Sequence, residues 1–282
     1  MGTPILQWTH FTKYYGTHCA VEDLNLTIEQ GQIVGFVGKN GAGKTTTIRA
    51  LTNMIFPTEG TITVAGMDSV RDAKAIKSIL GYMPGDCAFY DRITCRDLLK
   101  LCAKISKSSM DQALELASYF ELDVHKKLGE LSLGNRKKVS ILQALLKNGR
   151  ILVLDEPTNG LDPLMQSRFF DLLLEQKKKG VTIFLSSHNL SEIERYCDRV
   201  VILKDGRIVD DLDMSQVKTR HQQQVTYTTR QGEHKEFTFQ GDVNELVRTL
   251  SQLDLEKLEI KDSTIQEEFL KYYQEGENHE KA

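Results

Sequence analysis

A glycine-rich stretch, GKNGAGKTT, is the first part of the chain whose residue types and spacing could do chemistry. It fits the pattern G-x-x-x-x-G-K-[ST] and lies between an apolar run, IVGFVG, and a segment with helical spacing, TTTIRALTNM. Its glycines let successive backbone N–H groups curl around phosphate oxygens, while Lys44 adds positive charge and the Thr45 hydroxyl suits Mg²⁺. The alternative is a glycine-rich turn without a ligand. The candidate phosphate-binding residues are Gly38, Lys39, Asn40, Gly41, Ala42, Gly43, Lys44, Thr45 and Thr46.

Two adjacent carboxylates, Asp155 and Glu156, end the apolar run ILVLDEP. Because ligands of open α/β sheets bind at the carboxyl ends of the strands, we expect this pair beside the phosphate loop. Asp155 suits a Mg²⁺ ligand acting through water, and Glu156 is placed to polarise an attacking water. The alternative is that the acid pair only caps a helix.

Two further polar residues follow strand-like runs. His188, in LSSHNL after VTIFL, is expected at the same edge of the sheet, where it could contact a γ-phosphate. The alternative for His188 is a hydrogen-bonded structural histidine. Asp162 precedes Pro163, which predicts an N-cap with proline at the first helical position, and a functional role is kept open beside it.

Three cations, Arg136, Lys137 and Lys138, follow the turn residues Ser132 and Gly134 at the start of a predicted helix. Cations there are disfavoured by roughly 0.3–1 kcal/mol, because this end of the helix dipole is positive. An anion held by free N–H groups, the hydroxyl and the basic side chains would remove the conflict. The alternative is that the cations point into water.

Short apolar runs must position these residues. QIVGFVG, RILVLDEP, VTIFLSSH and RVVILKDG alternate with helical segments and are typical of strands buried on both faces of a mostly parallel sheet. ILQWTHF and AVEDLNLTIEQG alternate apolar and polar residues, which favours antiparallel strands with one face in water. The sequence therefore predicts an α/β fold with an antiparallel N-terminal β subdomain.

Strand signals stop between about residues 86 and 149. Apolar residues recur there at helical spacing in TCRDLLKLCAKI, SMDQALELASYFEL and SLGNRKKVSILQALLKN, which predicts a helical insert. Thr94 with Asp97, and Ser109 with Gln112, offer capping-box-like starts for two of its helices.

The pattern changes again near the C-terminal end. Two strand-like segments flank a turn at RQGEH, followed by a helix, a third strand and a final helix. One face of the first of these helices carries four apolar residues, Val243, Leu246, Val247 and Leu250. We therefore expect a main domain over residues 1–212, a small α+β domain with its own core over 213–275, and a polar tail over 276–282.

The composition is that of an ordinary globular protein, with 282 residues, 40% hydrophobic and 27% charged residues and a formal net charge of -3. No nucleic acid partner is expected, because there is no global positive charge. The start lacks a secretory signal, and no stretch approaches the roughly 18–20 apolar residues of a membrane span, which predicts a cytosolic protein. Five cysteines without metal-ligand spacing are expected to be reduced: Cys19, Cys87, Cys95, Cys102 and Cys197.

In this order, GKNGAGKTT, LSLGN, ILVLDEPTNGLD and SSH resemble the nucleotide-binding domain of an ATP-binding cassette (ABC) ATPase, a phosphate-loop NTPase. The resemblance covers about residues 5–210. In that family the LSxGx segment clasps the γ-phosphate of a nucleotide held by a second cassette. The resemblance thus implies that a partner chain supplies the anion to the signature residues Ser132, Leu133, Gly134 and Asn135.

The same resemblance gives roles to other positions. Tyr15, in FTKYYG, is similar to the aromatic that stacks on adenine, with a surface tyrosine as the alternative. Asp162 matches the segment that communicates across the dimer, and His188 matches the switch histidine. No guanine-reading NKxD motif occurs, which favours ATP over GTP.

Two departures from the family pattern stand out. The signature reads LSLGN rather than LSGGQ, which keeps Ser132 and Gly134 for gripping phosphate. In LGYMPGDCAFYDRIT the family usually has glutamine, sometimes glutamate, where this chain has Gly85 followed by Asp86. The usual residue contacts Mg²⁺ and the water and relays to the transporter. This departure concerns the rate and coupling of hydrolysis rather than ATP binding.

The resemblance implies a cytoplasmic ATPase subunit, peripheral on the inner face of the cell membrane. Two cassettes, identical or different, would pair around two MgATP and drive separate transmembrane permease subunits. The C-terminal region and the LGYMPxxxxFYDxxT style resemble exporters of antimicrobial peptides or drugs. Phe89 and Tyr90 are expected where the membrane partner docks, unless their rings are internal packing.

Two other classes of protein are alternatives. A soluble cassette ATPase acting on ribosomes or nucleic acid usually carries two cassettes or a long coiled coil, whereas this chain has one phosphate loop and no sustained heptads. A phosphate-loop kinase or GTPase would leave LSLGN unexplained.

Overall fold

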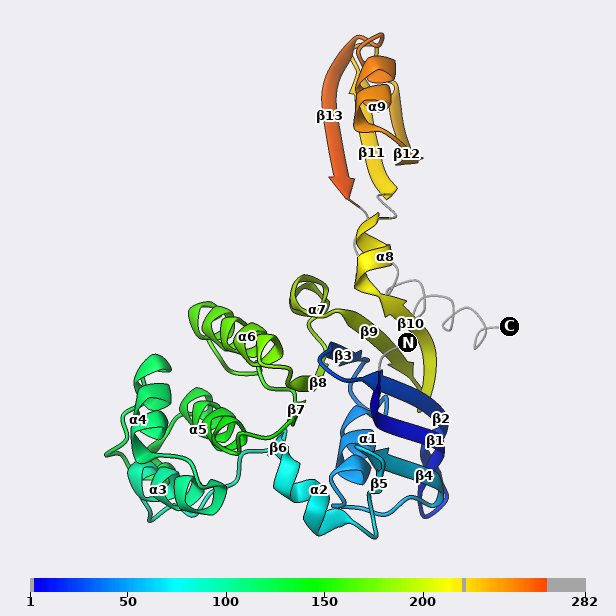
Figure 1. The fold of residues 1–282 in the computed structure, drawn as a ribbon. Coiled ribbons are helices and arrows are strands. Elements are labelled where there is room, and N and C mark those ends of the chain that lie inside the picture. Colours follow the sequence, from blue (N-terminus) through cyan, green and yellow to red (C-terminus); the bar gives the residue numbers. More distant parts are fainter. Residues whose placement is uncertain (1–2, 220–221, 263–282) are drawn as a thin grey trace. The chain divides into compact units, whose positions relative to one another are not determined.

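The computed structural model describes residues 3–219 and 222–262 (Figure 1). The chain divides into two compact units, Met1–Asp211 and Leu212–Ala282.

A four-stranded antiparallel sheet begins the first unit, with the strand order β2-β1-β4-β5. In β1, Leu6 and Trp8 are buried while Gln7 and Thr9 are exposed, as the alternating sequence predicts, although Ile5 beside Leu6 is buried as well. The antiparallel N-terminal subdomain is therefore confirmed. Its strands are β1 (Pro4–Tyr15), β2 (His18–Glu29), β4 (Glu59–Val64) and β5 (Met67–Asp68).

A six-stranded sheet forms the centre of the first unit, in the order β10-β9-β3-β8-β7-β6. The pairs β3–β8, β3–β9, β7–β8 and β6–β7 are parallel, so the carboxyl ends of these strands meet at one edge. Every residue of β3, β7 and β8 is buried, which explains their continuous apolar runs. The strands are β3 (Ile33–Val37), β6 (Leu80–Met83), β7 (Ile151–Asp155), β8 (Thr182–Ser187), β9 (Arg199–Lys204) and β10 (Arg207–Asp213).

The two sheets share one hydrophobic core. The ring of Phe184, on β8, lies 5.3 Å from the ring of Trp8 on β1 and 5.3 Å from that of Phe36 on β3, measured between ring centroids. Both sheets contribute buried residues to the same cluster, so the antiparallel sheet is fixed against the strands that carry the site.

Helices connect the parallel strands, and three of them form the predicted insert beyond β6 (Figure 1). Thr94 and Asp97 form a complete capping box at α3, and the Ser109 side chain accepts a hydrogen bond from the Gln112 N–H at α4, as expected. The insert contains α3 (Cys95–Ser106), α4 (Met110–Tyr119), the 3-10 helix η1 (Leu128–Glu130) and α5 (Leu133–Leu146). The other helices of this unit are α1 (Lys44–Leu51), α2 (Ala73–Ile79), α6 (Pro163–Lys178) and α7 (Leu190–Tyr196).

The second unit holds a three-stranded antiparallel sheet, in the order β12-β11-β13, with one helix packed on it. Its core contains Leu246 and Leu250 of that helix, whereas Val243 and Val247, the other two apolar residues of the expected helix face, are 48% and 51% exposed. The final helix and the polar tail expected from the sequence lie outside the described residues. The elements are α8 (Met214–Thr219), β11 (Gln222–Thr229), β12 (His234–Gln240), α9 (Val243–Leu250) and β13 (Leu255–Asp262).

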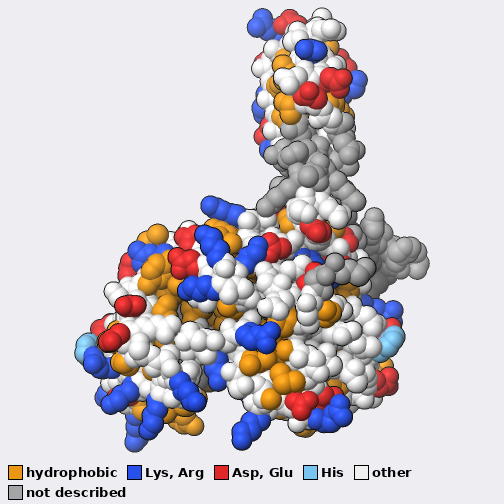
Figure 2. Space-filling model, in the orientation of Figure 1, with side chains coloured by type: hydrophobic (Ala, Val, Ile, Leu, Met, Phe, Trp, Pro, Cys, Tyr) orange, Lys and Arg blue, Asp and Glu red, His pale blue; other side chains and the backbone are white. Residues whose placement is uncertain are grey.

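Surface charge, helix hydrophobicity and the state of the cysteines are the remaining features of the fold. On the face shown in Figure 2, acidic and basic side chains are interspersed. Within residues 3–219 and 222–262, no helix has the length and apolarity needed to cross a membrane. All five cysteines are free thiols, as expected, and burial raises the pKa of the Cys95 and Cys197 thiols above the ordinary value.

Candidate functional site

The glycine-rich loop joins β3 to α1, as the sequence predicts. Gly41 and Gly43 adopt left-handed backbone angles, with φ of 86° and 104°. A Cβ at Gly43 would lie 2.6 Å from the Ala20 carbonyl oxygen, so only glycine fits. No side chain of the described residues caps the start of α1, which leaves its backbone N–H groups free for an anion.

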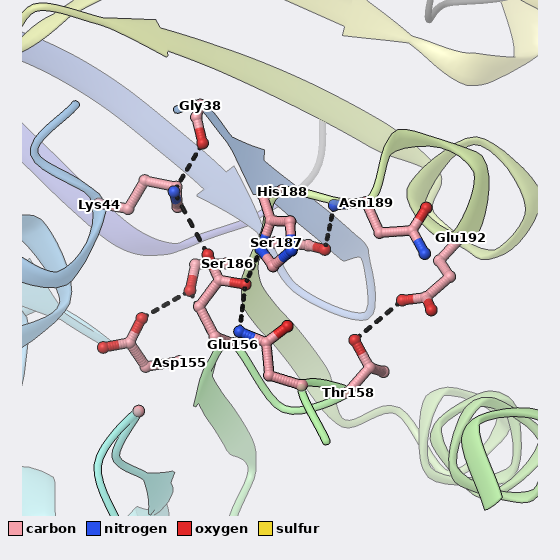
Figure 3. Close-up of polar contacts among 12 residues, drawn as sticks. Gly38, Lys44, Asp155, Glu156, Thr158, Ser186, Ser187, His188, Asn189 and Glu192 are labelled. Atoms are coloured by element: carbon pink, nitrogen blue, oxygen red, sulfur yellow. Dashed lines mark hydrogen bonds and ion pairs between the residues drawn. The ribbon is translucent and has the colours of Figure 1, made fainter. Parts of the chain in front are cut away.

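Lys44 places its ammonium over this loop. The side chain is buried, and Nζ donates to the carbonyl oxygens of Gly38 (2.6 Å) and Lys39 (3.2 Å). Nζ also lies 3.3 Å from Glu156 Oε1 (Figure 3). The lysine therefore connects the loop with the acidic end of β7.

A cavity of about 340 Å³ opens beside the loop. Tyr15 from β1 and Glu156 from β7 reach it together with loop residues, although Tyr15 lies in the antiparallel sheet. The structure thus brings the candidate adenine-stacking residue to the same cavity as the phosphate loop. The lining residues are Tyr15, His18, Ala20, Asn40, Gly41, Gly43, Lys44, Thr45, Thr46 and Glu156.

Asp155 ends β7 with a buried carboxylate. Its Oδ1 accepts hydrogen bonds from Ser186 Oγ (2.6 Å) and Thr45 Oγ1 (3.3 Å). Its Oδ2 is buried and has no hydrogen-bond partner among the described residues. An orphaned carboxylate oxygen beside a threonine hydroxyl is a donor set that suits a hard cation, so these residues fit Mg²⁺.

Glu156 has a strained backbone. Its φ of 48° lies in the left-handed region, which costs a residue with a Cβ about 1 kcal/mol or more. The Glu156 N–H donates to Ser186 Oγ (2.9 Å), and its carbonyl oxygen accepts from Lys137 Nζ (3.0 Å). Such strain persists where surrounding contacts over-determine it, which is typical of functional sites.

The Glu156 carboxylate is held between two basic groups. Oε1 lies 3.3 Å from Lys44 Nζ, and Oε2 lies 2.9 Å from His188 Nδ1 (Figure 3). Asp155 and Glu156 contact the side chains of Lys44, Thr45, Ser186 and His188, and neither is the N-cap of a helix in the described part of the chain, so the helix-cap alternative for this pair is wrong. His188 is hydrogen-bonded, as the alternative of a structural histidine requires. Its ring is nevertheless exposed, and its partner is the Glu156 carboxylate, which lines the cavity.

Sequence reasoning missed two polar residues beside this centre. Ser186, from the SSH stretch, bridges Asp155 Oδ1 and the Glu156 N–H. Glu192, on α7, accepts a hydrogen bond from Thr158 Oγ1 (2.9 Å), and burial raises the pKa of its carboxyl (Figure 3). Ser186 could have been identified from the sequence, because it lies at the end of an apolar strand beside His188. No sequence pattern indicated a role for Glu192.

The signature residues begin α5. Ser132 is its N-cap and accepts a hydrogen bond from the Asn135 N–H (3.3 Å), and both Ser132 and Leu133 are exposed. A Cβ at Gly134 would lie 2.6 Å from the Gly160 carbonyl oxygen, so α5 starts close to the loop that follows Glu156. None of residues 132–135 lines the cavity at the phosphate loop.

The alternative that the three cations behind the signature point into water is wrong for Lys137 and Lys138, whose side chains are buried. Lys137 is 3% exposed, and its Nζ donates to the carbonyl oxygens of Gly85 (2.8 Å) and Glu156 (3.0 Å). Arg136 donates to the carbonyl oxygens of Leu131 and Gly129. Backbone carbonyls thus satisfy two of these cations, because their oxygens carry partial negative charge.

Asp162 is the N-cap of α6, as predicted. Its Oδ1 accepts a hydrogen bond from the Met165 N–H (3.0 Å), and Pro163 occupies the first helical position.

A glycine-rich loop between a parallel strand and a helix, a lysine over it and an acidic strand end beside it define a phosphate-loop nucleoside triphosphatase. A family model described as "ABC transporter" matches residues 21–159. The bacitracin transport ATP-binding protein BcrA of Bacillus licheniformis is 38% identical over 228 residues, which cover 79% of this chain and 74% of that protein. The ABC transporter ATP-binding protein NatA of Bacillus subtilis (strain 168) is 34% identical over 197 residues, covering 67% of this chain and 80% of NatA.

Solved structures agree with these relatives. The ATP-binding subunit of an ABC transporter superposes with a TM-score of 0.70 at 30% identity, covering 76% of this chain and 92% of that chain. A dimeric ATP-binding cassette in a post-hydrolysis state, bound to ADP and Pi, has a TM-score of 0.69 at 23% identity, covering 74% and 99%, and shows the fold alone. The chain therefore belongs to the ABC transporter ATP-binding proteins, and it is an ATPase that uses MgATP.

Proposed function

We propose that this ATPase is the energy-supplying subunit of an exporter of an antimicrobial peptide or a drug, peripheral on the inner face of the cell membrane. The observation that carries the proposal is the 38% identity to a protein named for bacitracin transport, over 79% of this chain. ATP-binding subunits of this family dimerise and work with transmembrane permeases. Here two cassettes close around two MgATP, and closure and hydrolysis drive separate permease subunits.

The nucleotide lies in the cavity beside the phosphate loop. Backbone N–H groups of the loop and of α1, with the Lys44 ammonium, bind the β- and γ-phosphates; the support is that the loop and Lys44 line this cavity and that the N-cap of α1 makes no side-chain hydrogen bond. The Tyr15 ring stacks on adenine at the far side of the same cavity. The proposed nucleotide-binding residues are Tyr15, Gly38, Lys39, Asn40, Gly41, Ala42, Gly43, Lys44, Thr45 and Thr46.

Thr45 and Asp155 hold Mg²⁺, Asp155 through water, and the support is the free Oδ2 beside the Thr45 hydroxyl. Bound Mg²⁺ neutralises charge on the phosphate oxygens. Glu156 is the general base that orients and deprotonates the attacking water, with Lys44 and His188 aligning its two oxygens. The exposed His188 also senses the γ-phosphate.

The signature segment acts on the nucleotide of the second cassette. Ser132 and Leu133 are exposed, and residues 132–135 lie outside the lining of the chain's own cavity, which supports binding in trans. Asp162, close behind Glu156 in the chain and exposed at the start of α6, faces the partner in the same dimer.

An apolar surface suits the permease. A cavity of about 320 Å³ is lined by residues of α2, β6 and α3, by Gln143 of α5, and by Thr52 and Met54, which follow α1. A second cavity, of about 230 Å³, is lined by residues around Tyr90, and Gln143 lines both. Hydrophobic side chains are also exposed on the lower part of this unit in Figure 2. Tyr90 is 84% exposed, so its ring is not internal packing, while Phe89 is half-buried. An apolar cytoplasmic segment of the permease fits this surface.

The alternative function, a soluble cassette ATPase acting on ribosomes or nucleic acid, has less support. The relatives named above are transport proteins, and the face in Figure 2 mixes both signs of charge. A polyanion would favour a continuous basic surface.

Tyr15→Ala should weaken ATP binding by about 1–2 kcal/mol, or roughly 5- to 30-fold in Kd, because it removes the ring that stacks on the base. Tyr15→Phe should bind ATP as the wild type does. Tyr14→Ala is the matched control, since Tyr14 is a neighbouring tyrosine that is 40% exposed and does not line the cavity. Titration calorimetry measures all three. Equal weakening by Tyr14→Ala and Tyr15→Ala would contradict stacking.

Glu156→Gln should leave ATP affinity within about twofold and lower hydrolysis by roughly a hundredfold or more, because the carboxamide keeps the shape but cannot take a proton. A stable dimer should then accumulate with MgATP in size-exclusion chromatography. Glu175→Gln, an exposed position on α6, is the control. Near-normal hydrolysis together with a monomer would remove the role given to Glu156.

Ser132→Arg should abolish hydrolysis without weakening nucleotide binding by the isolated chain, because the segment serves the partner's nucleotide. Ser132 is preferred over Gly134, where any Cβ would press on the Gly160 carbonyl. Ser118→Arg, exposed on α4, is the control. Where the cassette pairs with a copy of itself, mixing the Ser132→Arg and Lys44→Ala chains should restore one working site of two. Loss of nucleotide affinity by the isolated Ser132→Arg chain would instead indicate a site in cis.

Tyr90→Ala, alone and with Phe89→Ala, should lower affinity for the permease by about 2 kcal/mol, or roughly 30-fold, as expected for an aromatic anchor. ATP binding and the thermal midpoint of the isolated subunit should not change. Co-purification with permease-containing membranes measures the effect, with Tyr14→Ala as the control. Wild-type stoichiometry in the double variant would place the docking surface elsewhere.

A further inference from the structure

Lys137 joins three parts of the molecule: the start of α5, the segment after β6 and the segment after β7. It lies on α5, two residues after the signature, and its ammonium donates to the Gly85 carbonyl (2.8 Å) and the Glu156 carbonyl (3.0 Å). Gly85 follows β6, and Glu156 follows β7, the neighbouring parallel strand. One side chain thus links the signature helix to two adjacent strand ends.

The peptide that Lys137 holds is the strained one. Glu156 is left-handed, and its backbone is fixed on one side by Ser186, which accepts from its N–H, and on the other by Lys137, which donates to its carbonyl. Relaxation of φ toward the right-handed or extended region would rotate these groups and break both hydrogen bonds. The same rotation would carry the carboxylate away from Lys44 and His188.

A buried ammonium keeps this arrangement rigid. Lys137 is 3% exposed, and an ammonium removed from water must keep hydrogen bonds to polar partners. The carbonyls of Gly85 and Glu156 are those partners, so neither can move without leaving the cation unsatisfied. A neutral apolar side chain of the same length would fill the space without this constraint.

We propose that Lys137 is a positioning residue for ATP hydrolysis, which ties the signature helix to the backbone of Glu156 and keeps the Glu156 carboxylate aligned at the nucleotide. The proposal rests on the proposed role of Glu156 as the general base. Lys137 touches neither nucleotide nor water in it. Movement of α5 when the signature engages the partner's nucleotide is passed to the general base through this ammonium.

Lys137→Met tests the proposal, because methionine has similar length and no donor. We expect kcat to fall on the order of 10- to 100-fold, as for a misaligned catalytic group. Nucleotide affinity of the isolated chain should stay within about twofold, since the phosphate loop is untouched. Lys137→Gln, whose amide keeps N–H donors but ends one bond short, should give an intermediate kcat. In a Glu156→Gln background, Lys137→Met should cause no further loss, because the group it aligns is already gone.

Lys138→Met is the matched control. Lys138 is the next residue on α5, is 9% exposed, and makes no hydrogen bond or ion pair with any residue in the described part of the chain. Its kcat should remain within about twofold of the wild type. Thermal unfolding and calorimetric ADP binding, measured on every variant, separate misalignment from a loss of folding.

Two results would overturn the proposal. One is an unchanged kcat in Lys137→Met while Glu156→Gln is inactive, which leaves the proposed function intact. The other is a parallel fall of kcat, ADP affinity and thermal midpoint in both Lys137 variants, which would indicate a role in folding alone. Normal hydrolysis by Glu156→Gln would instead remove the proposed general base itself, and this outcome is distinct from both.

Discussion

The ion pair between Lys44 and Glu156, with 3.3 Å between Nζ and Oε1, can form only if several distant parts of the fold are in place. Its side chains are mostly buried and come from the starts of two different connections, after β3 and after β7, with β8 between those strands in the sheet. Only the parallel order that brings their carboxyl ends to one edge lets them meet. β8 contributes Ser186, which fixes both Asp155 and the backbone of Glu156. The strand order is therefore a condition for the chemistry.

A hydrogen bond joins Gly85, which departs from the family pattern, to Lys137, a buried cation of the signature helix. Without a side chain, Gly85 approaches Asp155 so closely that a Cβ would lie 3.2 Å from Oδ2. Its carbonyl is then available to Lys137 on the signature helix. The family usually has a glutamine or glutamate at the position of Gly85. Here the side chain of Lys137, on α5, reaches the Gly85 carbonyl instead. The connection between the helical insert and the acidic strand end runs through a lysine and two backbone carbonyls.

The sequence predicted those features that depend on neighbours in the chain. Glycine spacing specified the loop at Lys44, the apolar run specified β7, and Thr94 and Asp162 marked helix starts, because each signal acts within a few residues. The path of Lys137 was not predictable, since its partners lie 52 and 19 residues away. Nor does the spacing of apolar residues say which residues of a helix face are covered: Leu246 and Leu250 are buried, whereas Val243 and Val247 are exposed.

Arg136 and Lys137, two of the cations at the positive end of the α5 dipole, are explained by their hydrogen bonds to backbone carbonyls. Lys137 and Arg136 donate to backbone carbonyls, while the Ser132 oxygen accepts the cap hydrogen bond and its hydroxyl proton stays available for donation. A phosphate of a second chain approaching this end would meet the helix dipole, free N–H groups and that hydroxyl together. Because Lys137 is anchored on the Glu156 carbonyl, a shift of α5 on binding that phosphate would act on the proposed general base of the chain's own site. In the proposed dimer, each nucleotide thereby influences the alignment of the base at the other.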